Sequence, residues 1–464
     1  MTTLATYIQT HQERFIEELK DYLRQPSVSA KSEHHQDVLR TAEYLQKAFR
    51  EIGMDKAEIC PTKGFPVVYA EKIIDPEAPT VLVYGHYDVQ PPEPLELWKS
   101  DPFDPEVRDG YLYARGADDN KGQFWAQFKA LEVLQQNGGL PCNVKFMVEG
   151  EEEVGSDSLP EFLTQHKAKL AADVIILSDT TMLSAEIPSI TTGLRGLSYV
   201  EVTVTGPNRD LHSGLYGGVA RNPINALAQM IASLHDAEGR ITIPGFYDRV
   251  LPISDAEAEA LRQVPISDQS YRDSLELDAL YGETGYSAFA RTTIRPTLDV
   301  NGIWGGYTGE GAKTVIPSEA HAKLSMRLVP DQDPDEITQL FTEHFLSIAP
   351  AGVRVLVRPH HGGQPMVTST DSVAYRAAES AYEAAFGVKP LAVRGGGSIP
   401  IVSLFREILG LEAIMMGFGL NENAIHSPNE RMSTEIILKG IHTVSEFYQR
   451  YAQAVQAERL ATTS

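Results

Sequence analysis

Hydrophobic residues in the first part of the chain follow two spacings. Apolar positions recur at helical spacing over residues 37–52, and residues 121–136 supply a second helix that can cross between strands. Other apolar residues come in short runs with few polar positions, at 80–84, 143–149 and 173–179. Runs of this kind are typical of strands that helices bury on both faces. This part of the chain therefore predicts an α/β fold with a mostly parallel central sheet and helices on both faces.

A strict alternation of apolar and polar residues begins near residue 190. It is clear at Val200, Val202 and Val204, and it returns over residues 322–328 and 353–357. Alternation marks strands with one face in water, which is the pattern of an antiparallel sheet. A helix is predicted in the same region, over residues 222–236.

From about residue 375 the first pattern returns, with a helix and then an apolar strand at 413–419. A chain of 464 residues is long enough for two hydrophobic cores. We therefore predict an α/β domain of residues 1–189 and 375–464, interrupted by an inserted α+β domain of residues 190–374 with an antiparallel sheet and helices.

Composition restricts the possible partners and the cellular compartment. The formal net charge of -23 argues against nucleic acid and anionic membranes, because both require a concentrated cationic face. No apolar run approaches the roughly 20 residues of a membrane helix. Two cysteines, Cys60 and Cys142, are too few for a disulfide scaffold, and the acid-rich N-terminus lacks the pattern of a secretion signal. We expect a cytoplasmic protein.

Acidic residues and histidines follow several of the predicted strands. Because ligands bind at the carboxyl ends of strands in open α/β sheets, we expect these side chains to meet at one edge. Two further acidic residues lie in a loop flanked by glycines, just before the predicted helix of residues 121–136. The set comprises His86 and Asp88 after the first strand, Asp118 and Asp119 in the loop, Glu151 to Glu153, Asp179, and His426.

Any one of these groups could be a solvated turn or a helix cap. Placed together, so many carboxylates would be prohibitively costly to bury without cations that neutralise them. Histidine and carboxylate ligands without a thiolate suit zinc, manganese or cobalt better than calcium. A carboxylate shared by two ions would make the site dinuclear, with a bridging water that needs a separate base.

Short strings across nearly the whole chain carry a family resemblance: GHYDVQP, ARGADDNKG, EGEEEVGS, LSDT, DLHSG and NAIHSPNE. They resemble the co-catalytic dinuclear zinc peptidases, which include aminoacylase, carboxypeptidase G and succinyl-diaminopimelate desuccinylase. GAKTVIPSEAHAKLSMRLVP, HGGQP and RGGGSIP are similar to the branch of cytosolic non-specific dipeptidase and carnosinase. The resemblance makes residues 190–374 a lid and dimerisation domain and the remainder the catalytic domain.

The resemblance implies a ligand set for two divalent ions per subunit, with zinc expected first and manganese or cobalt as alternatives. His86 and Asp179 match the ligands of one ion, Glu153 and His426 match those of the other, and Asp119 matches the bridging carboxylate. It also implies a cis peptide bond after Asp119 and leaves Asp118 outside the ligand set.

Three adjacent glutamates raise a question of register, because the family pattern has two. Counting back from Val154 makes Glu153 the ligand and Glu152 the general base, with Glu151 as the extra residue; a slip of one position is the alternative. Asp88 matches a residue that hydrogen-bonds the ligand His86 and supports its role in catalysis.

The inserted region matches residues that act on the substrate. His212 matches a histidine that the family donates across a homodimer interface to polarise the scissile carbonyl. Further positions match residues that hold the substrate and its terminal carboxylate, for which an arginine fork is suited. They are Arg327, Thr314, His361, Ser398, Gly395, Gly396 and Gly397.

The sequence thus predicts a metal-dependent hydrolase of dipeptides or short peptides with a free C-terminal carboxylate. An N-acyl-amino-acid amidohydrolase or desuccinylase on the same metal centre is the first alternative, because fold and metal site do not set the substrate. A non-catalytic binding protein is the second, and it would predict missing ligands, whereas here every ligand position is filled.

Overall fold

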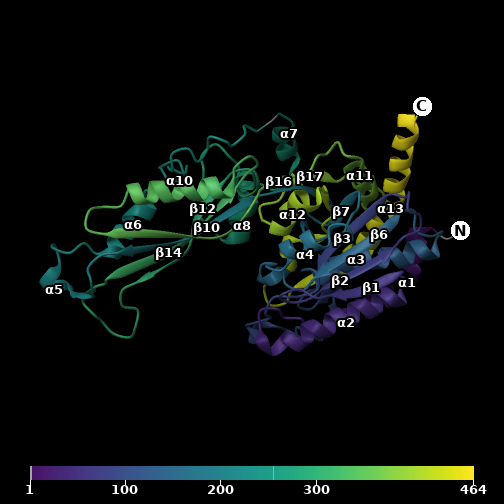
Figure 1. Cartoon of the computed structure of the whole chain (residues 1–464), viewed down its shortest axis with the longest axis horizontal. Helices are drawn as coiled ribbons and strands as arrows, with labels where there is room; N and C mark the ends of the chain where they lie inside the picture. The colour runs from purple at the N-terminus through teal and green to yellow at the C-terminus, as the bar shows by residue number, and fades with distance from the viewer. Residues whose placement is uncertain (1–2, 254, 464) are drawn as a thin grey trace. The chain divides into compact units, whose positions relative to one another are not determined.

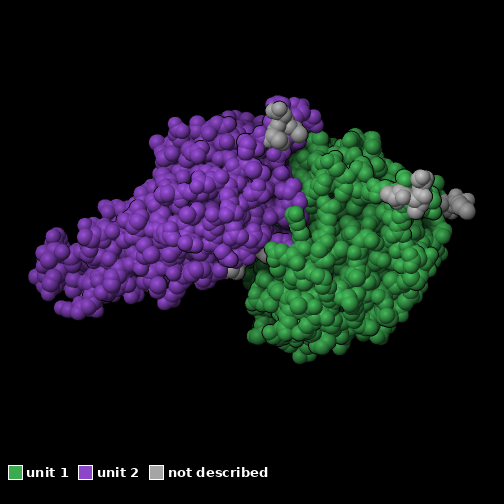
Figure 2. All heavy atoms as spheres, turned by 45° about the horizontal axis from the view of Figure 1, so that its top comes forward, with its two compact units in different colours: residues 1–192, 368–393, 404–464 green, residues 193–367, 394–403 purple. Residues whose placement is uncertain are grey.

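The computed structural model describes residues 3–253 and 255–463 (Figure 1). The chain divides into two compact units, shown in different colours in Figure 2. Unit 1 comprises residues 1–192, 368–393 and 404–464, and unit 2 comprises residues 193–367 and 394–403.

A mixed sheet forms the centre of unit 1. Its strands follow the order β1 (Lys56–Cys60), β2 (Val67–Lys72), β6 (Asn143–Glu149), β3 (Thr80–His86), β7 (Val174–Leu177), β18 (Ala413–Met415), β9 (Ser189–Leu194) and β16 (Met366–Val367), and β17 (Leu391–Arg394) pairs with β9. The four central strands, β6, β3, β7 and β18, are parallel, and this part of the prediction is confirmed. The pairs toward both edges are antiparallel, so the sheet as a whole is mixed.

Helices cover both faces of this sheet because alternate strand residues point to opposite sides and both sets are apolar. Val81 and Val83 of β3 share one core with a group of five helices. Tyr84, on the other face, meets Phe405 edge-on with ring centroids 5.2 Å apart, beside α4 (Leu159–Gln165). The five helices are α1 (Leu4–Leu23), α2 (His35–Glu51), α3 (Lys121–Gln136), α11 (Val373–Phe386) and α13 (Thr434–Thr463).

Two predicted elements differ from the observed ones at their ends. The apolar stretch at 413–419 is not one strand: β18 stops at Met415, and a second short strand, β19 (Gly419–Leu420), pairs with β8 (Thr181–Met182). The chain leaves the sheet at Gly417, where a side chain would overlap the Thr180 carbonyl oxygen. Helix α6 (Pro223–Ala232) follows its N-cap Asn222 but ends short of the predicted residue 236. The chain after it turns back instead: the Leu234 carbonyl accepts a hydrogen bond from Thr242 N, and His235 forms an isolated β-bridge with Ile241.

Unit 2 is built on an antiparallel sheet in the order β12 (Thr297–Gly305), β14 (Glu319–Leu328), β10 (Gly196–Thr205) and β15 (Arg354–Gly363). The alternating residues Val200, Val202 and Val204 point into a core closed by α6 and α10 (Pro334–Ser347). A separate pair joins β11 (Leu211–His212) to β13 (Val315–Ile316). The shorter helices are α5 (Ser213–Tyr216), α7 (Asp255–Gln263), α8 (Asp268–Leu275), α9 (Ala288–Thr293) and α12 (Pro400–Leu404).

A small sheet consists of β4 (Glu106–Arg108), β5 (Tyr111–Tyr113) and β20 (Arg431–Ser433). In sequence, β5 precedes the loop that carries Asp119, and β20 follows the loop that carries His426. Among the described residues, no helix is both long enough and apolar enough to cross a bilayer.

Candidate metal centre

The parallel centre of the sheet brings the predicted ligands to one edge. His86 is the last residue of β3, Asp179 lies two residues beyond β7, and Glu153 lies in a single helical turn, Glu152–Val154, that follows β6. Parallel strands end on the same side of a sheet, which is why residues almost 100 positions apart in sequence become neighbours. Asp119 directly precedes Asn120, the N-cap of α3.

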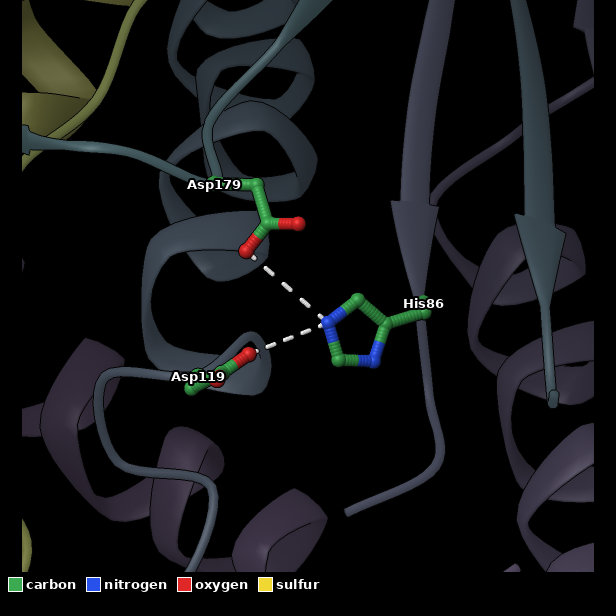
Figure 3. A group of neighbouring side chains, drawn as sticks. All are labelled: His86, Asp119 and Asp179. Atoms are coloured by element: carbon green, nitrogen blue, oxygen red, sulfur yellow. Dashed lines mark hydrogen bonds and ion pairs between the residues drawn. The ribbon is translucent and has the colours of Figure 1, made fainter. Parts of the chain in front are cut away.

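Asp119 lies between two separate groups of side chains. Its Oδ1 is 3.1 Å from His86 Nε2, and that nitrogen is 3.8 Å from Asp179 Oδ1 (Figure 3). Its Oδ2 is 2.8 Å from His426 Nε2, which lies 3.3 Å from Glu153 Oε2. Each group offers three ligand atoms to one position, and Asp119 belongs to both.

The clustered carboxylates and histidines of both groups would be stabilised by bound cations. Burial lowers the pKa of His86, but hydrogen bonds to neighbouring carboxylates outweigh this and raise the pKa well above 6.5. Hydrogen bonds to Asp119 and Glu153 raise the pKa of His426 to about 10. Both histidines are thus driven to hold an extra proton, and a divalent cation would displace it while satisfying the same carboxylates. Glu153 Oε1 is buried without a hydrogen-bond partner, which also suits a cation at this position.

The turn after β6 separates the three glutamates. Glu153 alone joins a ligand group, while the Glu151 carbonyl accepts hydrogen bonds from the backbone of Val154 and Ser156. Burial raises the pKa of Glu152 well above 4.5, and the nearby carboxylates of Asp179 and Asp119 raise it further, while His86 lowers it. Glu152 is therefore a strong proton acceptor beside the ligand groups.

Asp88 contacts both the turn that contains Glu152 and Glu153 and the side chain of His86. Its carboxylate accepts hydrogen bonds from the backbone N–H groups of Glu152 at 3.2 Å and Glu153 at 3.1 Å, and from Ser29 Oγ at 2.7 Å. His86 Nδ1 lies 3.1 Å from the Asp88 backbone oxygen and 3.4 Å from its carboxylate. The expected contact with the carboxylate is therefore the longer of the two, and the backbone carbonyl is the nearer partner of Nδ1.

The peptide bond between Asp119 and Asn120 is cis, as the resemblance implies. Asn120 donates a hydrogen bond to Asp179 Oδ1 at 2.8 Å, so it orients one of the ligand carboxylates. Asp118 is turned away from both groups and accepts hydrogen bonds from Gln123 and Asn423. Sequence reasoning did not single out Asn120, although it stands directly beside the bridging position.

Most of the chain matches a single protein family. Residues 82–450 match the model of peptidase family M20/M25/M40. The chain belongs to this family. It is 32% identical to human Beta-Ala-His dipeptidase, over 96% of this chain and 92% of the relative. It is 31% identical to Cys-Gly metallodipeptidase dug1 of Schizosaccharomyces pombe, over 94% of this chain and 95% of that relative. The crystal structure of the M20 family metallo-carboxypeptidase Sso-CP2 from Sulfolobus solfataricus superposes with a TM-score of 0.85 at 35% identity, over 95% of this chain and 99% of that one.

Unit 2 of this M20 family member places its predicted residues in two clusters. His212 and Thr314 lie together on the β11–β13 pair, where the Thr314 carbonyl accepts a hydrogen bond from Ser213. His212 is exposed, and its Nδ1 accepts a hydrogen bond from Gly214 N at 2.9 Å, which leaves the ring N–H of the neutral form on Nε2. His361 lies in β15, and its side chain is outside the described residues.

The second cluster joins Arg327 to the glycine-rich loop. Arg327 donates to Ser398 Oγ at 2.7 Å. Arg195, which sequence reasoning missed, donates from Nε to the Gly396 carbonyl at 2.7 Å, and its backbone N–H bonds to the Gly397 carbonyl. Gly395 N donates to the Gly193 carbonyl, and a side chain at Gly396 would overlap the Thr292 carbonyl oxygen. The only signal for Arg195 was its place between two glycines, which many arginines share.

Proposed function

We propose that this chain is a dinuclear metallo-dipeptidase that hydrolyses the peptide bond of dipeptides or short peptides with a free C-terminal carboxylate. The observation that carries the proposal is that Asp119 presents one carboxylate oxygen to each of two ligand groups. Membership of the M20 family and the metallodipeptidases among its relatives support it.

His86, Asp119 and Asp179 would hold one divalent ion, and Asp119, Glu153 and His426 the other. When bound, two such ions activate a water molecule and polarise the scissile carbonyl. Zinc suits the mixed histidine and carboxylate ligands, and manganese and cobalt accept the same set.

Glu152 is proposed as the general base. It lies beside both ligand groups without belonging to either, and burial and nearby carboxylates raise its pKa. It would take a proton from the attacking water and deliver it to the leaving amine, which is how one carboxylate serves both halves of a hydrolysis.

Arg327 and Ser398, with Gly395 to Gly397, are proposed to bind the terminal carboxylate of the substrate. Burial lowers the pKa of Arg327. Burial, and after it the positive charge of nearby Arg327, lowers the pKa of Arg195 to about 10. The described hydrogen bonds of both guanidinium groups go to neutral oxygens. The charge of Asp299 acts on both groups and raises their pKa, but no described hydrogen bond or ion pair joins it to either. A partly buried pair of cations without a hydrogen-bonded carboxylate favours an anionic ligand. Thr314 and His361 are proposed as further substrate contacts.

His212 is proposed to polarise the scissile carbonyl in the active site of a partner subunit, with residues 190–374 acting as the lid and dimerisation domain. Its fixed tautomer supports this role, because Nε2 can then donate a hydrogen bond to an oxyanion. We also propose a cytoplasmic location, in keeping with two buried free cysteines.

The named relatives favour two substrate classes that the metal centre alone does not separate. Two relatives are named as dipeptidases, whereas Sso-CP2 is named as a carboxypeptidase. N-acyl amino acids are a third class, since they share the free carboxylate. A panel of one dipeptide, its N-acetylated form, its C-terminal amide and an N-acetyl amino acid separates these classes.

The dipeptide is expected to be the best substrate, by at least about tenfold in kcat/KM over the N-acetylated forms, with the amide the worst because it lacks the carboxylate for Arg327. A preference for the N-acetyl amino acid would replace the dipeptidase proposal with amidohydrolase activity. A preference for the N-acetylated dipeptide would favour a carboxypeptidase.

A further inference from the structure

Glu430 is a fully buried carboxylate close to the metal centre but outside both ligand groups. Its Oε1 accepts hydrogen bonds from the backbone N–H groups of Asp118 at 2.8 Å and Asp119 at 3.0 Å. Its Oε2 accepts from Gly116 N at 2.9 Å and from Arg115 Nη1 at 2.7 Å. All four donors belong to residues 115–120, the loop that carries the proposed bridging carboxylate, and three of them are backbone N–H groups.

Glu430 itself belongs to the loop that carries the candidate ligand His426. We call residues 115–120 the Asp119 loop and residues 421–430 the His426 loop. Glu430 lies four residues after His426, so one carboxylate connects a ligand-bearing loop to the backbone of the next.

A second carboxylate connects the same two loops in the opposite direction. Asp118, in the Asp119 loop, accepts a hydrogen bond from Asn423 Nδ2 of the His426 loop at 2.7 Å. Gln123 donates to the other Asp118 oxygen at 2.8 Å and accepts from Phe418 N. The two loops are therefore cross-braced by reciprocal contacts inside the protein.

The His426 loop needs such contacts. Ala424, His426 and Asn429 all have left-handed backbone conformations, with φ of 58°, 60° and 64°. This region is unfavourable for residues other than glycine, so surrounding contacts must hold the loop. The side chain of His426 is 51% exposed and receives little packing of its own.

The first ligand group is braced by a different residue. Asn120 donates to Asp179 Oδ1 at 2.8 Å and to the Ser178 carbonyl, while His86 ends a central strand. Neither Asp179 nor His86 contacts Glu430 in the described hydrogen bonds and ion pairs. The two groups thus depend on different supporting side chains, although Asp119 is common to both.

From this difference we infer that Glu430 is a positioning residue that sets the distance between Asp119 and His426, and so fixes the affinity of the second ion more than that of the first. The inference rests on the proposed dinuclear function. It assigns a role to a residue that touches neither ion nor substrate.

Glu430→Gln tests the inference with little change in shape. Each carboxylate oxygen accepts two of the four hydrogen bonds, so an amide nitrogen in place of either oxygen removes two of them and sets N–H groups against N–H groups. Residues that support metal ligands typically change metal affinity by about 10–100-fold when altered. We expect a loss of that size for one zinc ion and less than about threefold for the other.

The measurement is a titration of the metal-free full-length protein with zinc against a chromophoric zinc chelator, which resolves two dissociation constants. His426→Ala and His86→Ala provide references for damage to each ligand group. Glu283→Gln is the matched control: Glu283 is a buried carboxylate in unit 2 that accepts three hydrogen bonds from Arg295 and Arg240. Thermal melts of every variant measure loss of stability separately.

The inference predicts that Glu430→Gln loses the same ion as His426→Ala, while Glu283→Gln binds two ions like the unaltered protein. Equal weakening of both ions, no weakening, or loss of the His86 ion alone would overturn it. If Glu430→Gln does not fold, Asn423→Ala, which removes the reciprocal contact, must show the same selectivity. Fewer than two zinc ions on the unaltered chain would contradict the proposed function instead.

Discussion

The side chains of Glu152 and Glu153, which are adjacent in sequence, have different surroundings, and only Glu153 joins a ligand group. The neighbouring residue, Glu153, turns its carboxylate toward His426, while Glu152 is held by its backbone N–H on Asp88. The Asp88 carboxylate thus holds the backbone N–H groups of both residues, while their side chains take different places. A change at Glu152 should therefore affect the chemistry without releasing ions.

Glu152→Gln is expected to lower kcat by about 10²–10⁴-fold, because the amide cannot take a proton from water. The matched control is Glu151→Gln, which alters a carboxylate next to the site but outside the ligand groups, and it should keep most of the activity. Steady-state kinetics with metal analysis of both proteins checks this. Near-normal turnover of Glu152→Gln with two ions bound would instead identify another base.

Residues that carry the chemistry could be predicted from sequence more readily than the residues that support them. His86, Asp119 and Glu153 lie in short strings that resemble a known family, and each sits beside a strand or helix that the hydrophobic pattern predicts. Glu430 is 311 positions from Asp119, and nothing local distinguishes it from a solvated glutamate. Its role depends on contacts that form only after the chain folds.

At the scale of elements, the start of α3 presses against the Asp119 loop. Gly122 is the second residue of the helix, and an added Cβ would lie 1.8 Å from the Ala117 carbonyl oxygen. In most helices, replacing glycine by alanine stabilises by about 1 kcal/mol. Here the close backbone contact reverses that preference and makes glycine a requirement for the loop that carries the bridging ligand.

Gly122→Ala is expected to destabilise the protein by about 1–3 kcal/mol, the range for overpacked sites, and to weaken the binding of both ions because Asp119 is displaced. Denaturant unfolding and zinc titration measure the two effects. Gly302→Ala is a suitable control, since an added Cβ at Gly302 meets no atom within 4 Å. Unchanged stability and metal binding in Gly122→Ala would show that the loop tolerates the shift.

The central strands and their helices could be predicted because their patterns are continuous. Residues 143–149 and 121–136 appear in the structure with those limits, as β6 and α3. The antiparallel edge strands β1 and β2 were not predicted, nor was the long C-terminal helix α13. Strand direction depends on pairing with distant residues, and periodicity within one segment does not report it.

At the scale of the whole molecule, the candidate metal ligands and the proposed substrate contacts belong to different units. The ligand groups belong to unit 1, whereas His212, Arg327 and Ser398 belong to unit 2. Our proposal that His212 serves the active site of a partner subunit makes a complete site the product of two chains. A dimer of two differently altered chains can test this directly.

Neither His212→Ala nor Glu152→Gln alone should retain much activity. In a mixed dimer, one site combines an intact Glu152 with an intact His212 from the partner chain. An equal mixture after subunit exchange should therefore recover about one quarter of the unaltered rate, since half of the dimers are mixed and each has one intact site. Differently labelled chains establish that exchange has occurred. No recovery after proven exchange would place His212 in its own subunit's site, and near-normal activity of His212→Ala alone would place it outside catalysis.

The central claim is that two ions sharing Asp119 drive dipeptide hydrolysis, and one measurement tests it most directly. Metal-free protein is titrated with zinc, and with manganese in parallel, while bound ions per chain and the release of amino acids from a dipeptide are followed together. We expect two ions to bind per chain, with full turnover only when both are bound. Full dipeptide turnover with a single ion per chain, or no dipeptide turnover with two bound, would contradict it.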